Sequence, residues 1–177
     1  MFLELINTRR SIRKFKRTSV EKEKINTLIE AALRSPSSRG RNAWQFIVID
    51  DISLLEKLSQ AKPHGAGFLK GAPLGIVVCG DTSTSDVWIE DTAIASIFIH
   101  LAAHDMGLGS CWIQIRERDH TTSKSADAYI KDLLHIPDHL MIESIIAIGY
   151  PDEIKKGHEK NALPSGKVSF NTYTLKD

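Results

Sequence analysis

The chain has 177 residues, 42% of them hydrophobic and 25% charged, and its 23 basic and 22 acidic side chains leave a formal net charge of +1. This composition predicts one globular domain over residues 1–177 and excludes a disordered or fibrous chain. The near-neutral balance argues against nucleic acid as a partner, because that affinity grows with the number of phosphates neutralised. No apolar stretch in the sequence approaches the roughly 20 residues of a membrane span, and no secretory signal is recognisable, so we expect a cytoplasmic protein without a membrane partner.

Hydrophobic periodicity predicts the first elements. Ser19 is expected to cap a helix whose apolar side chains recur at helical spacing until Ser35 and Pro36 end it. A strand over 44–49, a helix over 53–61 and a fully buried strand over 74–79 are expected to follow.

The second half of the chain continues the alternation of helix and strand. Residues 86–106 are apolar on every face, which predicts a central helix buried nearly all round, in the core or at a dimer seam. We then expect a strand over 110–115, a helix over about 123–134 and a buried strand over 141–148. Residues 152–166 should form a surface loop, and the alternation over 168–173 predicts a half-buried edge strand. The architecture implied is a central sheet, mixed in direction, with helices on both faces.

Positive charge is concentrated near the N-terminus, where six of the nine residues from Arg9 to Arg17 are basic. Arginine offers a planar fork of donors that matches phosphate oxygens, and the Ser11 hydroxyl adds a short neutral donor. The run therefore suits one phosphate group. From charge alone, a solvated basic turn is the alternative.

Other candidate sites have little support in the sequence. His100 and His104 are four residues apart, but the glutamate of the zinc-protease pattern is missing, so no metal ligand is predicted. Cys79 and Cys111 lie in apolar surroundings and are expected to be buried free thiols. No serine-nucleophile motif is present, and the sequence predicts no catalytic residue of the protein's own.

Three segments together are more specific than any one alone: Arg9 to Arg13, Ser35 to Trp44 and Gly107 to Gln114. In this order and spacing the chain resembles the nitroreductase family of flavoproteins, in particular its shorter members, through Pro151. The resemblance implies a three-layer α/β/α sandwich, a homodimer with one tightly bound FMN in each of two sites at the subunit boundary, and a C-terminal segment that reaches across the partner.

The resemblance also implies which residues contact the FMN phosphate and ribityl chain. These are the polar members of the N-terminal run and late lysines: Arg9, Arg10, Ser11, Arg13, Lys155 and Lys156, with Lys160 as a possible substitute.

The isoalloxazine ring is assigned by the resemblance to two further segments. The turn of Pro36, Ser37 and Ser38 is expected to close over the ring from the second subunit, mainly through backbone groups, with Asn42 near its amide side. Gly40 stands where many members carry asparagine. The strand-end residues Trp112, Ile113 and Gln114 are expected to bring a backbone amide near the flavin N5 and O4.

The function implied is an FMN-dependent oxidoreductase that transfers reducing equivalents from NAD(P)H, as co-substrate, to nitroaromatic, quinone or related acceptors by a ping-pong mechanism. The cofactor carries the chemistry, so no protein acid or base is required. Segments 63–70 and 119–125 are expected to line the opening for the acceptor. The alternatives are reductive dehalogenation or flavin fragmentation on the same fold, or a non-catalytic flavin-binding protein.

Overall fold

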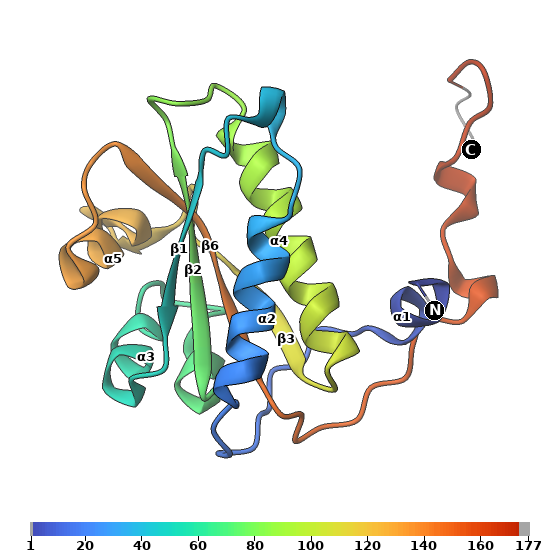
Figure 1. Cartoon of the computed structure of the whole chain (residues 1–177), viewed down its shortest axis with the longest axis horizontal. Coiled ribbons are helices and arrows are strands. Elements are labelled where there is room, and N and C mark those ends of the chain that lie inside the picture. Colours follow the sequence, from blue (N-terminus) through green and yellow to red (C-terminus); the bar gives the residue numbers. More distant parts are fainter. Residues whose placement is uncertain (1, 174–177) are drawn as a thin grey trace.

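The middle layer of the molecule is a four-stranded antiparallel sheet, seen in the computed structural model, which describes residues 2–173 (Figure 1). Its strands lie in the order β1-β2-β6-β3. Their bounds are Trp44–Ile49 for β1, Leu74–Asp81 for β2, Gly109–Gln114 for β3 and Leu140–Gly149 for β6. β1 and β3 are therefore the two edges of the sheet.

Helices cover both faces of this sheet (Figure 1). α2 (Lys22–Leu33) and α4 (Trp88–Asp105) pack on one face, while α3 (Ile52–Leu58) and α5 (Ala126–Leu134) pack on the other. The remaining elements are short: α1 (Phe2–Thr8), the hairpin β4 (Asp119–Thr121) with β5 (Lys124–Ser125), and the 3-10 turns η1 (Ser38–Gly40), η2 (Gly67–Gly71), η3 (Lys160–Ala162) and η4 (Ser165–Lys167).

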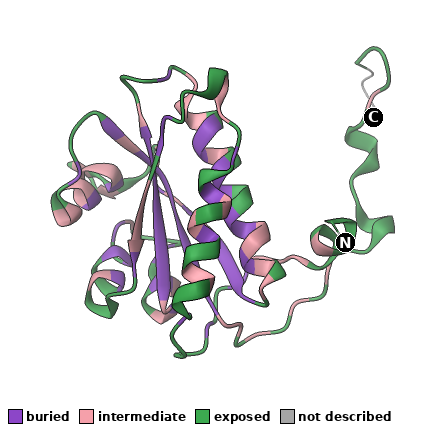
Figure 2. Ribbon diagram, in the orientation of Figure 1, coloured by how far each residue is buried: buried purple, intermediate pink, exposed green. Residues whose placement is uncertain are grey.

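Two apolar layers, one on each face of the sheet, form the core. Figure 2 shows the inner strands buried along their length, and every residue of β2 except Asp81 is buried. Such continuous burial explains why β2 and β6 read as apolar runs in the sequence rather than as alternating strands. Across residues 2–173, no helix has both the length and the apolar character needed to cross a lipid bilayer.

The predicted three-layer sandwich is confirmed, with two differences in detail. All named strands pair antiparallel, and the predicted mixed character of the sheet is limited to a parallel bridge between Ser11 and Ser110 at its edge. α2 begins after Glu21 rather than at Ser19, since the intervening Val20 is buried in the core. Cys79 and Cys111 are buried free thiols, as predicted.

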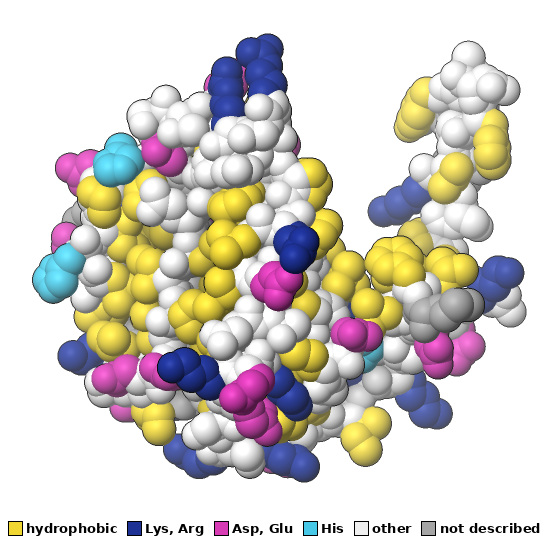
Figure 3. Space-filling model, viewed as in Figure 1, with side chains coloured by type: hydrophobic (Ala, Val, Ile, Leu, Met, Phe, Trp, Pro, Cys, Tyr) yellow, Lys and Arg dark blue, Asp and Glu magenta, His cyan; other side chains and the backbone are white. Residues whose placement is uncertain are grey.

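The prediction of a strand over 168–173 is wrong for the single chain. These residues form no strand, and the side chains of Phe170 and Tyr173 are 84% and 83% exposed. A strand requires a neighbour for its backbone groups, and this segment projects away from the body of the molecule (Figure 3). We call residues 158–173 the C-terminal arm.

The prediction that α4 is buried nearly all round is likewise met on one side only. Ala95, Ile99 and Ala103 are buried, whereas Ile97 and Phe98 on the outer side are 43% and 37% exposed. An exposed apolar helix surface of this kind is typical of an interaction site, and residues 2–173 leave it uncovered.

A close approach at the start of β3 explains the glycine at position 109. A Cβ added to Gly109 would lie 2.7 Å from Cβ of Ile12. We expect Gly109→Ala to lower the free energy of unfolding by about 1–3 kcal/mol, because the N-terminal segment would have to move off the strand. Urea denaturation of the two proteins measures this difference in the free energy of unfolding. Gly67→Ala, where a Cβ meets nothing within 4 Å, is the matched control and should have a much smaller effect.

Candidate functional site

The basic N-terminal segment lies along the edge of the sheet. Ser11 forms the parallel bridge to Ser110 of β3, and the backbone N–H of Ile12 donates to the Ser110 carbonyl at 3.0 Å. Successive side chains of an extended segment point to opposite sides. Arg9, Ser11 and Arg13 therefore share one side, and Ile12 occupies the other side in the core.

The charges of Arg9, Arg13 and Lys155 all act on the buried Cys111, and we call these three residues the cationic cluster. Burial raises the pKa of the Cys111 thiol, while the charges of Arg13, Lys155 and Arg9 and a hydrogen bond with Ser11 act in the opposite direction. The Lys155 ammonium also donates to the Ser11 carbonyl at 2.8 Å. Residues more than 140 positions apart in the sequence thus meet at one place.

Glu153 fixes the backbone of this cluster. Its Oε1 accepts hydrogen bonds from the Arg13 and Lys14 N–H groups at 2.6 and 3.2 Å, and it lies 3.1 Å from Nζ of Lys155. These contacts, the Arg13 N–H first, hold the pKa of Glu153 below its ordinary value. The sequence analysis missed Glu153, for which the only signal was its place two residues before Lys155.

The two guanidinium groups of the cluster lack a carboxylate partner within residues 2–173. The Arg13 guanidinium lies 5.8 Å from the centre of the Phe68 ring. The positive charge of Arg9 acts to lower the pKa of Cys111 and of the two histidines of α4, and Arg9 forms no ion pair within the described residues. Glu153 contacts the backbone of Arg13 rather than its side chain. The cluster therefore presents uncompensated positive charge with a planar donor geometry suited to an oxyanion.

Arg10 and Lys156 contact each other next to this cluster. The Arg10 guanidinium donates to the Lys156 carbonyl, so Lys156 takes part through its backbone, and its side chain is exposed. Arg10 lines a cleft of about 240 Å³ that it shares with Glu153 and Lys155 as well as with Thr8 and His104. Lys160 lies on the C-terminal arm, in η3.

The outer edge of β3 carries the next predicted segment. The Ser110 carbonyl points to the outer edge of β3, where it accepts from Ile12. In a strand the backbone groups of every second residue point to the same edge, so the N–H groups of Trp112 and Gln114 also face outwards, away from β6. The Trp112 indole donates to Oε1 of Gln114 at 2.9 Å, and the Ile113 side chain is buried. The edge thus offers backbone donors beside the cationic cluster.

The loop over 36–42, which contains Pro36, lies at the opposite end of α2 from the basic segment (Figure 1). Its turn is closed by the Ser37 hydroxyl, which accepts from the Asn42 N–H at 2.9 Å, and Gly40 has a φ of 64°. The Ser38 N–H donates at 2.8 Å to the carboxylate of Asp91, which is only 2% exposed. Within one chain this loop does not reach the cationic cluster.

The two histidines of α4 each have a hydroxyl partner. His100 Nδ1 lies 2.7 Å from the Ser110 hydroxyl, and His104 Nε2 lies 2.8 Å from that of Thr8. Burial and the charge of Arg9 lower the pKa of His100 to about 4. A neutral His100 thus supports Ser110, the residue on which the basic segment rests.

This buried histidine should make stability depend on pH. The folded pKa of about 4 lies below the ordinary 6.5, so the unfolded chain binds the extra proton between these values and stability falls as the pH drops from 6.5 towards 4. We expect a loss of up to about 3 kcal/mol from this group, measured by urea denaturation across that range. His100→Gln should flatten the dependence, whereas His64→Gln, at an exposed position, should not.

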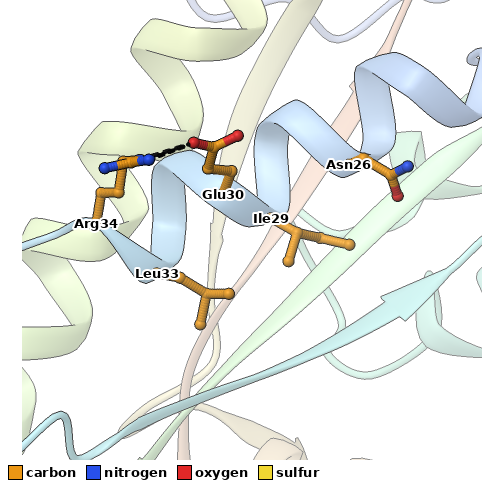
Figure 4. A pocket seen from close by; sticks show the side chains of 5 residues that line it. All are labelled: Asn26, Ile29, Glu30, Leu33 and Arg34. Carbon is orange, nitrogen blue, oxygen red and sulfur yellow. Dashed lines mark hydrogen bonds and ion pairs between the residues drawn. The ribbon is translucent and has the colours of Figure 1, made fainter.

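Two further hollows have an apolar character. One, of about 370 Å³, lies on α2 between Ile29, Leu33 and the ion pair of Glu30 with Arg34 (Figure 4). A larger one, of about 750 Å³, is lined mainly by apolar side chains of α1 and α4, among them Phe2, Leu5, Phe98 and Leu101. Neither gathers the polar groups of a catalytic or phosphate site.

Comparison with known proteins gives one family. The model of the nitroreductase family matches residues 6–62 and 56–150. The solved structure of an FMN-dependent nitroreductase from Clostridium difficile R20291 is 48% identical, with a TM-score of 0.95 over 97% of this chain and 99% of that one. A "Putative NADH dehydrogenase/NAD(P)H nitroreductase" of Methanothermobacter thermautotrophicus is 39% identical over 85% of this chain and 78% of its own length. An "FMN reductase (NADPH)" of Bacillus subtilis is 27% identical over 98% of this chain and 74% of its own.

Proposed function

This chain belongs to the nitroreductase family, and from that premise we propose that it is an FMN-dependent oxidoreductase that reduces nitroaromatic, quinone or related acceptors with NAD(P)H in a ping-pong cycle. The observation that carries the proposal is the cationic cluster beside the free edge of β3. Bound FMN would supply the redox chemistry, since it accepts a hydride from the nicotinamide and passes reducing equivalents to the acceptor.

The residues of the cluster fit a phosphate monoester in charge and geometry. A phosphate of this kind carries a charge of about −1.5 to −2 near pH 7. Arg9, Arg13 and Lys155 would neutralise it, and the Ser11 hydroxyl would add a neutral donor. Arg10 and Lys156, which bond to each other, would instead hold the base of the C-terminal arm.

The free edge of β3 fits the role of a donor to the polar rim of a flavin ring. Fixed backbone N–H groups, here those of Trp112 and Gln114, stabilise negative charge without reorganisation. The ring would lie beside the strand, with Ile113 anchoring that strand in the core. No side chain of the protein has to exchange a proton in this scheme.

A homodimer with FMN at the interface completes the proposal. The loop that contains Ser37, Ser38 and Asn42 lies at the far end of α2 from the cluster, so it would close over the FMN of the partner. The apolar outer surface of α1 and α4 is available for the subunit contact. The exposed arm would then cover the second subunit, and the free edge of β1 offers it backbone partners.

The direct test is the absorbance of the purified protein and the mass of the small molecule that heat releases. We expect a yellow protein that retains FMN and oxidises NADH or NADPH when a quinone or nitroaromatic acceptor is present. Protein that retains FMN but oxidises no nicotinamide would favour a non-catalytic flavin protein. Colourless protein that does not take up added FMN would overturn the proposal.

A further inference from the structure

The proposed phosphate site contains an acidic side chain, Glu153, whose position there needs a physical reason. A single carboxylate oxygen, Oε1, accepts from the N–H groups of Arg13 and Lys14 at 2.6 and 3.2 Å and lies 3.1 Å from Nζ of Lys155. Because these contacts hold the pKa of Glu153 below its ordinary value, the carboxylate is ionised at neutral pH. A negative charge in this position repels a phosphate, so it must contribute something that offsets the repulsion.

Backbone contacts already attach the segment that carries Glu153 to the basic N-terminal segment. The Asp152 N–H donates to the Lys14 carbonyl at 2.9 Å, and an antiparallel bridge joins Phe15 to Pro151. Neither contact involves a side chain. The carboxylate of Glu153 therefore adds contacts to a junction that the main chain holds together, and these extra contacts all reach the cationic cluster or the residue next to it.

The first consequence concerns the Lys155 ammonium, which has three N–H donors. It donates to the Ser11 carbonyl at 2.8 Å and forms the ion pair with Glu153 at 3.1 Å. Lys155 and Glu153 both line the cleft of about 240 Å³, so the ammonium is held in place at the wall of an open space. Two of its donors are engaged inside the chain, and the third is left for a group that enters the cleft.

The second consequence concerns Arg13 and the charge of the site. Glu153 takes the backbone N–H of Arg13, so this residue is left with its guanidinium, 5.8 Å from the centre of the Phe68 ring, to offer to a ligand. Donors that are fixed before binding lose less conformational freedom when the ligand arrives. The three cations and the one carboxylate leave a net charge of +2, which matches the charge of about −1.5 to −2 on a phosphate monoester.

We propose that Glu153 is a positioning residue of the phosphate site: it fixes Lys155 and the backbone of Arg13, and it thereby sets the preference for FMN over riboflavin, the same flavin without the phosphate. The inference rests on the proposed function, because it takes FMN to be the ligand. Positioning and charge alone predict opposite results. Removing a carboxylate beside a phosphate tightens binding if charge alone matters, and weakens it if the carboxylate holds the donors in place.

The test measures the dissociation constants of FMN and of riboflavin by fluorescence titration of the FMN-free protein, for the unchanged chain, Glu153→Ala and Glu153→Gln. The glutamine variant keeps an oxygen that can accept from the Arg13 N–H but lacks the charge that pairs with Lys155. Asp152→Asn is the matched control. It removes one exposed carboxylate from the preceding residue and leaves the backbone bond to Lys14 in place.

We expect Glu153→Ala to weaken FMN binding about tenfold or more and Glu153→Gln about threefold or more, while riboflavin binding changes by less than about twofold. Asp152→Asn should leave FMN affinity within about twofold. FMN binding that is unchanged or tighter in the Glu153 variants, or equal losses for FMN and riboflavin, would overturn the role. If Glu153→Ala does not fold, Glu153→Gln decides the question alone. Failure of the proposed function is distinct, because the unchanged protein would then bind no FMN or show no turnover.

Discussion

Replacing Arg9 or Arg13 by glutamine is expected to weaken FMN binding about tenfold to a hundredfold, because each change removes charge-assisted hydrogen bonds of about 1.5–3 kcal/mol to the phosphate. Neither guanidinium has an ion-pair partner among the described residues, so neither substitution leaves an acidic group unpaired inside the chain. The loss should therefore appear in cofactor affinity and hardly in the stability of the FMN-free protein. Fluorescence titration of the FMN-free protein with FMN measures the first, and urea denaturation measures the second.

The control for this experiment is Lys16→Gln, which removes one positive charge from the same basic run. Lys16 is exposed, and its backbone N–H bonds to the Tyr150 carbonyl, away from the cluster. Its affinity for FMN should stay within about twofold of the original, since exposed charges at a distance are screened by salt. If Lys16→Gln weakens binding as much as Arg9→Gln, the effect is one of overall charge, and the assignment of the phosphate to the cluster is wrong.

Removal of residues 158–177 is expected to convert the proposed dimer to a monomer and to weaken FMN binding. The chain leaves the body at Gly157, which packs so closely against the backbone of Asn7 in α1 that a Cβ has no room. Beyond that point the arm exposes Leu163, Val168 and Phe170, which are 53%, 53% and 84% accessible. Burial of such side chains on a second subunit contributes roughly 25 cal/mol per Å² of apolar area, and this contribution is lost with the arm.

Sedimentation equilibrium and flavin absorbance read out the two consequences separately. A second variant, Phe98→Glu, leaves the arm intact but places a charge on the apolar outer surface of α4, and it should also favour the monomer. If the shortened chain remains a dimer that retains FMN, the arm has no part in assembly. A monomer that still binds FMN as tightly as the full chain would show instead that the site belongs to one subunit.

Local patterns in the sequence were sufficient for most of the secondary structure. The strand predicted over 44–49 matches β1 to the residue, because turn residues bound a short apolar run there. The strand predicted over 168–173 is not formed in the single chain, because a strand also needs a neighbouring segment that the local pattern does not specify. Alternation indicates that one side of a segment will be buried, but not that the partner belongs to the same chain.

In the candidate site, too, local sequence patterns predicted one part, and contacts between distant segments decided the rest. The basic run, with Ser11 among its arginines, predicted a phosphate-binding segment, because the chemistry of guanidinium and hydroxyl groups is present in the residues themselves. Which arginines face the site depends on the bridge to Ser110, which turns Arg10 away towards Lys156.

The sequence by itself therefore determined the order of helices and strands, the apolar faces and the concentration of positive charge near the N-terminus, since these depend on neighbours along the chain. Only the tertiary structure decided the antiparallel pairing of the strands and the meeting of Arg13 with Glu153 and Lys155. It also separated the Ser37 loop from the cluster. Each of these depends on contacts between residues far apart in the sequence, whose geometry is set by how the whole sheet and its helices pack.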